Sequence, residues 1–182
     1  DLRRRSFSDV RIRLGSTQRI LGQAARGQPW QVPLENPFTT GATLGTVRLA
    51  APRPALVVLP LRAHTVTIGS NTYGHIINPL SGRPAEGTAL AAVLGPSATM
   101  AHALAQALVV RGVEHASELL ERFPKCEAMV VPDRQPMELW CTDGFAELLS
   151  LSTNAVATVI PLPRGTVSPT SAAPAEPEAP TP

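Results

Sequence analysis

Short strand-like runs, each ended by glycine or proline, constrain the fold of this chain more than any other feature. Residues 10–14 alternate apolar and polar side chains, Gly15 interrupts them, and residues 19–22 resume the pattern. Further runs of this kind lie at 30–34, 55–61, 65–68 and 72–73. Alternation with a period of two is typical of strands, and short glycine-containing breaks are typical of hairpins. The first half of the chain is therefore predicted to be mostly sheet, with Pro33 on an edge strand.

The second half contains the clearest helix of the sequence. It follows a predicted strand at 88–94 and runs from Ser97, an N-cap residue, to Arg111, with Gly112 as its stop signal. Its buried stripe is predicted to consist of Met100, Leu104, Ala107 and Leu108.

The elements after this helix are shorter. A second helix is expected at 115–123, with Leu119 and Leu120 inward. Strands at 127–131 and 137–141 and a short helix at 143–149 follow. The fold class expected is α+β: a mainly antiparallel sheet packed by a long central helix and by shorter helices.

Composition argues against several classes of protein. Lys125 is the only lysine among 16 basic residues, and the arginines are scattered beyond residues 3–5. Phosphate-tracking surfaces need clustered cations and stacking aromatics, but aromatic residues make up only 4% of the chain, so no nucleic-acid partner is expected. No apolar run reaches the roughly 18 residues that a membrane-spanning helix needs, so no such segment is predicted.

Three segments are predicted along the chain. Residues 1–9 form a basic N-terminal end, and residues 10–160 form one folded domain. Residues 161–182 hold seven prolines among alanine, threonine, serine and glutamate. Because such a composition buries too little apolar surface to fold, this segment is predicted to be a disordered tail.

The two cysteines allow two interpretations. Cys126 and Cys141 lie symmetrically about residues 132–135, so a hairpin closed there would set them opposite each other. A disulfide is then possible. Two unbridged cysteines behaving as small apolar residues are the favoured reading, since facing positions alone do not provide disulfide geometry.

Two segments carry the residues of a candidate ligand site. The first is Tyr73-Gly74-His75-Ile76-Ile77-Asn78-Pro79-Leu80-Ser81-Gly82-Arg83-Pro84, in which an imidazole stands beside a turn. The second is the long helix, on which His102 and Gln106 share one face because they are four residues apart. Each imidazole also has an alternative without a ligand. His75 could be a half-buried histidine that is hydrogen-bonded within the protein, and His102 could be a solvent-facing histidine of the helix.

These motifs resemble the C-terminal half of the ApbE family, the FAD:protein FMN transferases. The resemblance covers about Arg11 to Val131 and rests chiefly on the pattern around His75 and on the helix with Gly112 after it. It implies the family's T-fold-like α+β architecture, and FAD contacts at His75, Ile76 and Asn78. We expect the family's N-terminal half, which supplies much of the flavin cradle, to be missing from these residues.

The resemblance also implies a reaction and its participants. FAD is split at its pyrophosphate, FMN is attached to a threonine hydroxyl of a target flavoprotein, and AMP leaves, with Mg²⁺ on the phosphate oxygens. The resemblance further suggests a bacterial protein of the cell envelope or periplasm.

The positions that correspond to the family's magnesium ligands carry other residues here. An aspartate and a threonine of the family appear as His102 and Gln106, and there is no aspartate between Asp9 and Asp133. The third residue of the family's Gly-Gly-Asp appears as Thr17, and the aspartate of its His-Ile-Ile-Asp-Pro motif appears as Asn78. Glu35 and Glu86 are the only acids near the matched motifs.

Three hypotheses remain open from these residues. The first is an FMN transferase with altered metal positions, and the second is a catalytically inactive flavin-nucleotide-binding or scaffold protein of the same family. The third is one part of a split transferase. Magnesium prefers hard, charged oxygen ligands and is poorly served by imidazole, so His102 is the residue that most separates the first two.

Overall fold

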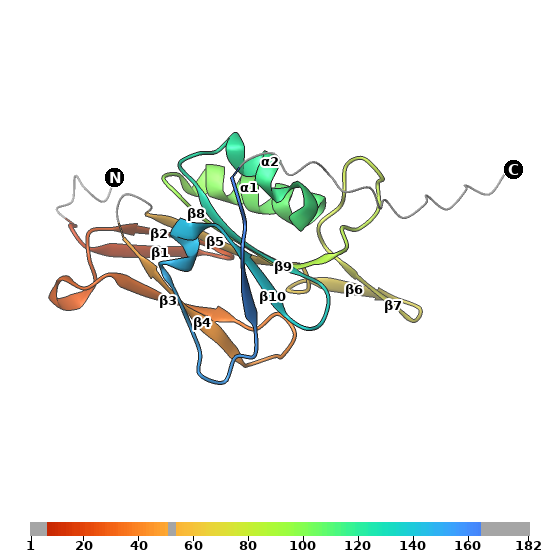
Figure 1. The fold of residues 1–182 in the computed structure, drawn as a ribbon, viewed down its shortest axis with the longest axis horizontal. Helices are drawn as coiled ribbons and strands as arrows, with labels where there is room; N and C mark the ends of the chain where they lie inside the picture. Colours follow the sequence, from red (N-terminus) through yellow and green to blue (C-terminus); the bar gives the residue numbers. More distant parts are fainter. Residues whose placement is uncertain (1–6, 51–53, 165–182) are drawn as a thin grey trace, which may run out of the picture.

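A seven-stranded sheet forms the centre of the fold in the computed structural model, which describes residues 7–50 and 54–164 (Figure 1). Its strand order is β1-β2-β5-β8-β9-β10-β12, and every neighbouring pair is antiparallel except β10 and β12. The strands are β1 Val10–Leu14, β2 Thr17–Leu21, β5 Ala55–Pro60, β8 Thr88–Gly95, β9 Glu127–Pro132, β10 Glu138–Cys141 and β12 Thr158–Pro161. The expected α+β class with a mainly antiparallel sheet is confirmed.

Helices α1 Ala98–Arg111 and α2 Ala116–Glu121 cover one face of this sheet, whereas a smaller sheet and the short helix α3 Asp143–Ala146 cover the other (Figure 1). The 3₁₀ turns are η2 Ala25–Gly27 and η3 Val113–His115. The smaller sheet has the order β11-β4-β3, with β3 Trp30–Glu35, β4 Thr43–Leu49 and β11 Leu149–Leu151. The hairpin of β6 Thr65–Ile68 and β7 Asn71–Gly74 projects from one end of the molecule.

Two apolar cores follow from this layering. Side chains alternate along the central strands, so Val57, Val93 and Val130 face α1 and α2, whereas Leu56, Leu94 and Met129 face the smaller sheet. Central strands buried on both faces carry continuous apolar runs, as in β8 and β9, where every residue is buried. Edge strand β3 carries Pro33 with its side chain exposed, as predicted.

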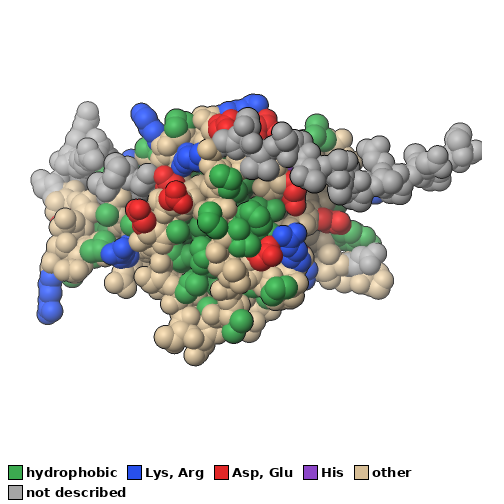
Figure 2. Space-filling view, in the orientation of Figure 1, with side chains coloured by type: hydrophobic (Ala, Val, Ile, Leu, Met, Phe, Trp, Pro, Cys, Tyr) green, Lys and Arg blue, Asp and Glu red, His purple; other side chains and the backbone are tan. Residues whose placement is uncertain are grey.

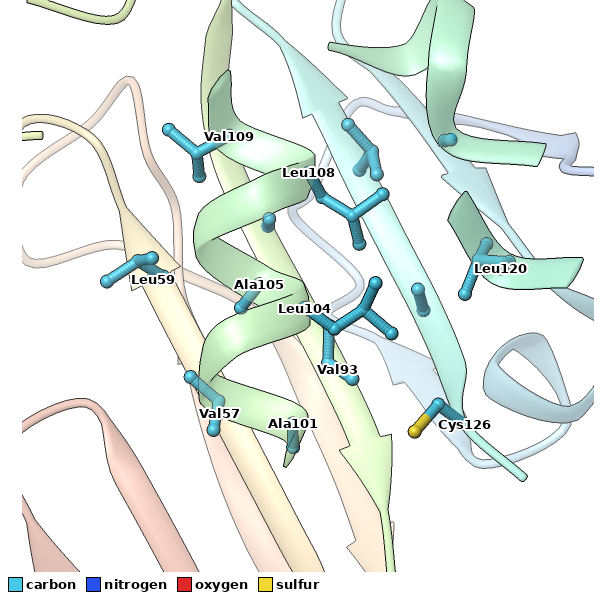
Figure 3. Close-up of a cluster of buried hydrophobic side chains, with 14 of the residues drawn as sticks. Val57, Leu59, Val93, Ala101, Leu104, Ala105, Leu108, Val109, Leu120 and Cys126 are labelled. Atoms are coloured by element: carbon cyan, nitrogen blue, oxygen red, sulfur yellow. The ribbon is translucent and has the colours of Figure 1, made fainter. Parts of the chain in front are cut away.

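Helix α1 packs on the sheet through small residues. Ser97 caps its first turn by accepting the Met100 N–H through its side chain, and Gly112 ends it with a φ of 72°. The buried stripe is Ala101, Leu104, Ala105, Leu108 and Val109, which lies directly over β5 and β8 (Figure 3). The two alanines let the helix approach the strands closely.

The predicted stripe of α1 was wrong at Met100, which is exposed, and at Ala107, which is only half-buried. Leu104 and Leu108 are buried as expected, but Met100 is 38% exposed. The residue that faces the sheet is the next one, Ala101, and adjacent residues of an α-helix point in different directions around the helix axis. The helix expected at 143–149 is also shorter than predicted, since α3 ends at Ala146 and Leu149 already begins β11.

The cysteines are not bridged, in agreement with the favoured reading. The hairpin of β9 and β10 places Met129, not Cys126, opposite Cys141. Cys126 belongs to the core under the helices and Cys141 to the core under the smaller sheet, so the two thiols lie on opposite faces.

Residues 161–164, predicted to belong to a disordered tail, are instead part of the fold. Pro161 is the last residue of β12, and the Leu162 side chain is 4% exposed in the helix-side core. Residues 165–182 lie outside the described part of the chain, as do residues 1–6 of the predicted basic end.

Apolar side chains also remain on the surface. In the face shown by the space-filling view, hydrophobic side chains gather near the middle, with acidic and basic groups around them (Figure 2). Val156 and Val159, beside the sheet edge formed by β12, are 89% and 43% exposed. No helix in the described ranges is long and apolar enough to cross a membrane.

Candidate functional site

The loop between β7 and β8 holds the residues predicted to contact a flavin. It is closed by backbone bonds: the Asn78 N–H donates to the Arg83 carbonyl at 2.8 Å, and the Gly82 N–H donates to the Asn78 carbonyl at 2.9 Å. Gly82 has a φ of 68°, a conformation that other residues adopt only with strain. The proline- and glycine-rich sequence therefore fixes one compact turn.

Ile76 and Asn78 stabilise this turn in different ways. The Ile76 side chain is buried in the core under α1, and the Ile76 carbonyl accepts the Ala85 N–H at 2.7 Å. The Asn78 Oδ1 accepts the Leu80 N–H at 3.0 Å, which is an Asx turn and leaves the side-chain NH₂ group with hydrogens to donate. Ile76 is thus an anchor, and Asn78 retains donor capacity toward a ligand.

His75 is exposed at the start of the loop. Its Nδ1 lies 3.2 Å from the His64 carbonyl, and the two imidazole rings meet edge to face at 5.3 Å between centroids. Because a carbonyl oxygen only accepts, Nδ1 carries the hydrogen of this bond, and Nε2 of the neutral ring is then an acceptor. The loop therefore presents an oriented imidazole at the surface.

The predicted metal positions lie on α1. His102 is half-buried, and its Nδ1 is 3.0 Å from the Thr17 Oγ1 of β2. Gln106, one turn further along, is exposed. Arg19 stands two residues after Thr17 on the same face of β2, and its Nη1 donates to the Pro96 carbonyl at 3.1 Å, just before α1.

The two parts of the predicted site lie at different places along β5. Thr17 pairs with Val57, whereas Gly74, directly before the β7–β8 loop, lies against Leu61, which follows β5. Four residues of strand correspond to about 13 Å, so only an extended ligand could reach both. Among the described residues no hydrogen bond joins His75 or Asn78 to His102 or Gln106.

The sequence singled out Thr17 as the counterpart of a family aspartate, but it did not predict that Thr17 contacts His102. Thr17 stands in the Gly15-Ser16-Thr17 turn, but its contact with His102 joins positions 85 residues apart, which no local pattern reveals.

The side chains around His102 do not fit a magnesium site. β1, β2, β5, β8 and α1 contain no aspartate or glutamate. Across the described ranges no three His, Cys, Asp or Glu side chains are grouped so that they could hold a metal. Glu35 and Glu86 are both exposed. An imidazole already bonded to a hydroxyl and an exposed amide are poor ligands for a hard dication.

Comparison with known proteins defines the class of this α+β fold. The model of the ApbE family matches residues 1–130, more than half of the chain, and the chain therefore belongs to the ApbE family. Two curated relatives are FAD:protein FMN transferases. The one from Treponema pallidum is 32% identical over 127 residues, which are 64% of this chain and 32% of the relative. The one from Rhodobacter capsulatus is 31% identical over 114 residues, which are 63% of this chain and 21% of the relative.

Solved structures give the same fold. The chain is similar to the ApbE protein of Thermotoga maritima with a TM-score of 0.67 at 20% identity, over 77% of this chain and 44% of that one. For the flavin transferase ApbE of Vibrio cholerae the TM-score is 0.64 at 20% identity, over 81% of this chain and 46% of that one. The chain thus spans about a third or less of these curated relatives and under half of these solved structures.

Proposed function

We propose that the protein containing this chain is an FAD:protein FMN transferase. In this reaction FMN passes from FAD to a threonine hydroxyl of a target flavoprotein, and AMP is released. The observation that carries the proposal is the 32% identity to an FAD:protein FMN transferase over 127 residues, together with the family match at residues 1–130. The partners of the reaction are accordingly FAD and a flavoprotein with an acceptor threonine.

The β7–β8 loop is the part of the chain that we assign to flavin binding. His75 offers a ring nitrogen whose tautomer is set by the His64 carbonyl, and Asn78 offers side-chain N–H groups beside it. Ile76 holds both residues by anchoring the turn in the core. A site built on a closed turn loses little conformational entropy when a ligand binds.

A second function is supported by the surroundings of His102. The contact with Thr17 and the lack of carboxylates on β1, β2, β5, β8 and α1 favour a catalytically inactive flavin-nucleotide-binding protein. Mg²⁺, the expected cofactor of the first function, finds no suitable ligands at His102 and Gln106. Both functions require that the protein bind FAD.

One experiment separates these functions. The full-length protein is incubated with FAD, Mg²⁺ and a threonine-containing acceptor flavoprotein, beside an active FMN transferase as control, and the acceptor is examined by mass spectrometry. We expect the added mass of FMN if the protein is a transferase. No added mass beside a working control would reject catalysis.

FAD fluorescence titration tests the binding step itself. We expect His75→Ala to weaken FAD binding, whereas His115→Ala, an exchange of the same type far along the chain on η3, leaves it unchanged. FAD binding without transfer supports the inactive binder, and absence of FAD binding contradicts both functions.

A further inference from the structure

The face of β2 that meets α1 has an unusual charge balance. Thr17 and Arg19 point to this face, where they contact His102 and the Pro96 carbonyl. The neighbouring strand places Leu14 opposite Thr17 and Ile12 opposite Arg19, with 82% and 46% of these side chains exposed. An arginine, an imidazole and two exposed apolar side chains thus share one surface.

Carboxylates are missing from the elements that build this surface. Strands β1, β2, β5 and β8 and helix α1 contain no aspartate or glutamate, and the first turn of α1 contains no acidic residue. The charged side chains that these five elements do carry are arginines, of which Arg19 lies on this surface. A dication placed here would meet a cation without a compensating anion, whereas phosphate groups would be attracted.

The hydrogen bond between Thr17 and His102 takes up one of the two imidazole nitrogens. The Thr17 Oγ1 and the His102 Nδ1 lie 3.0 Å apart. A metal ion here would be left with the Nε2 nitrogen, a hydroxyl oxygen and the Gln106 amide, and with no charged oxygen ligand. Arg19 has further N–H groups besides the Nη1 bonded to Pro96, since a guanidinium carries five.

We propose that this surface holds the phosphates of a flavin nucleotide without a divalent cation, with Arg19 supplying the positive charge and no carboxylate present on these elements to bind a metal. The proposal rests on the proposed binding of FAD. It specifies which group neutralises the negative charge of the phosphates, and it assigns this role to Arg19.

FAD titration in excess Mg²⁺ and in excess EDTA tests the proposal. We expect the dissociation constants in the two buffers to agree within about twofold. Arg19→Gln is expected to weaken binding by roughly tenfold, the typical effect of losing a hydrogen bond to a charged group.

Arg13→Gln is the matched control for Arg19→Gln. Arg13 pairs with Gln18, so it stands on the opposite face of the same hairpin, and its loss changes the net charge equally. We expect less than a twofold effect. Equal losses in the two variants, or FAD binding that requires Mg²⁺, would overturn the proposal.

A second measurement does not depend on FAD. Thermal unfolding with and without MgCl₂ should show no stabilisation of the unaltered protein, whereas the double variant His102→Asp, Gln106→Thr should gain a saturable Mg²⁺-dependent rise in Tm. Saturable stabilisation of the unaltered protein would refute the inference while leaving the transferase proposal intact. Failure to bind FAD in either buffer, by contrast, would reject the proposed function and this inference together.

Discussion

Cys141 is a buried group whose chemistry is set by its surroundings. It lies on β10 with its side chain 1% exposed, and burial raises the pKa of its thiol to about 12. Desolvation is the cause, because a thiolate loses its hydration in an apolar core. The thiol is therefore neutral near neutral pH, which makes Cys141 a core residue and a poor nucleophile.

The raised pKa of Cys141 predicts a loss of stability at high pH. The unfolded chain releases the thiol proton near pH 9.0, whereas the folded protein retains it up to about pH 12. Stability from this group is fully present below pH 9.0 and falls above it, by up to about 1.4 kcal/mol per pH unit. Urea unfolding across this range should show a steeper decline for the unaltered protein than for Cys141→Ala. Parallel declines would contradict the prediction, since Cys126 is common to both proteins.

Helix α1 shows that packing, and not residue type, decides how much an apolar side chain contributes to the free energy of unfolding. Leu104 is 1% exposed and Met100 38% exposed, although both are long apolar residues one turn apart. Leu104→Ala should lower the free energy of unfolding by about 2–5 kcal/mol, because it leaves a cavity over β8. Met100→Ala should cost less than about 1 kcal/mol. Urea denaturation measures both, and similar costs would show that the helix is rotated from the described orientation.

The elements that the sequence predicted are those with strong local signals. The strands at 10–14 and 30–34 alternate, and Ser97 and Gly112 mark the ends of α1, so each was found within one or two residues. The rotation of α1 was missed at Met100 because the alanines that face the sheet carry little hydrophobic signal. β11 and β12 were missed because they have three and four residues and depend on partners far along the chain.

In the candidate site, likewise, the sequence predicted the local turn but not the contacts between distant segments. The motif around His75 identified a closed turn and the family, since its glycines and prolines determine the backbone locally. The partner of His102 was not predictable, because the topology alone brings β2 beside α1. The separation of the β7–β8 loop from Thr17 along β5 likewise follows from strand pairing.

At the scale of the whole molecule, the last described residues form one edge of the seven-stranded sheet and pack into the helix-side core. β12 pairs in parallel with β10, and Leu162 enters the core under the helices. The Arg164 guanidinium bonds to the Leu120 and Cys126 carbonyls and lies 3.1 Å from the Glu127 carboxylate. These contacts connect α2, β9 and the chain after β12.

Two truncated proteins test where the folded domain ends. A chain ending at Arg164 retains every contact just described, so its Tm should stay within about 2 °C of that of the full chain. A chain ending at Ala157 loses β12, the buried Leu162 side chain and the Arg164 contacts. We expect its Tm to fall by more than about 5 °C, because burial of one leucine alone contributes about 1.5–3 kcal/mol. Thermal unfolding followed by circular dichroism measures both. Equal losses in the two proteins would place folded structure beyond Arg164, and no loss in either would show that β12 is dispensable.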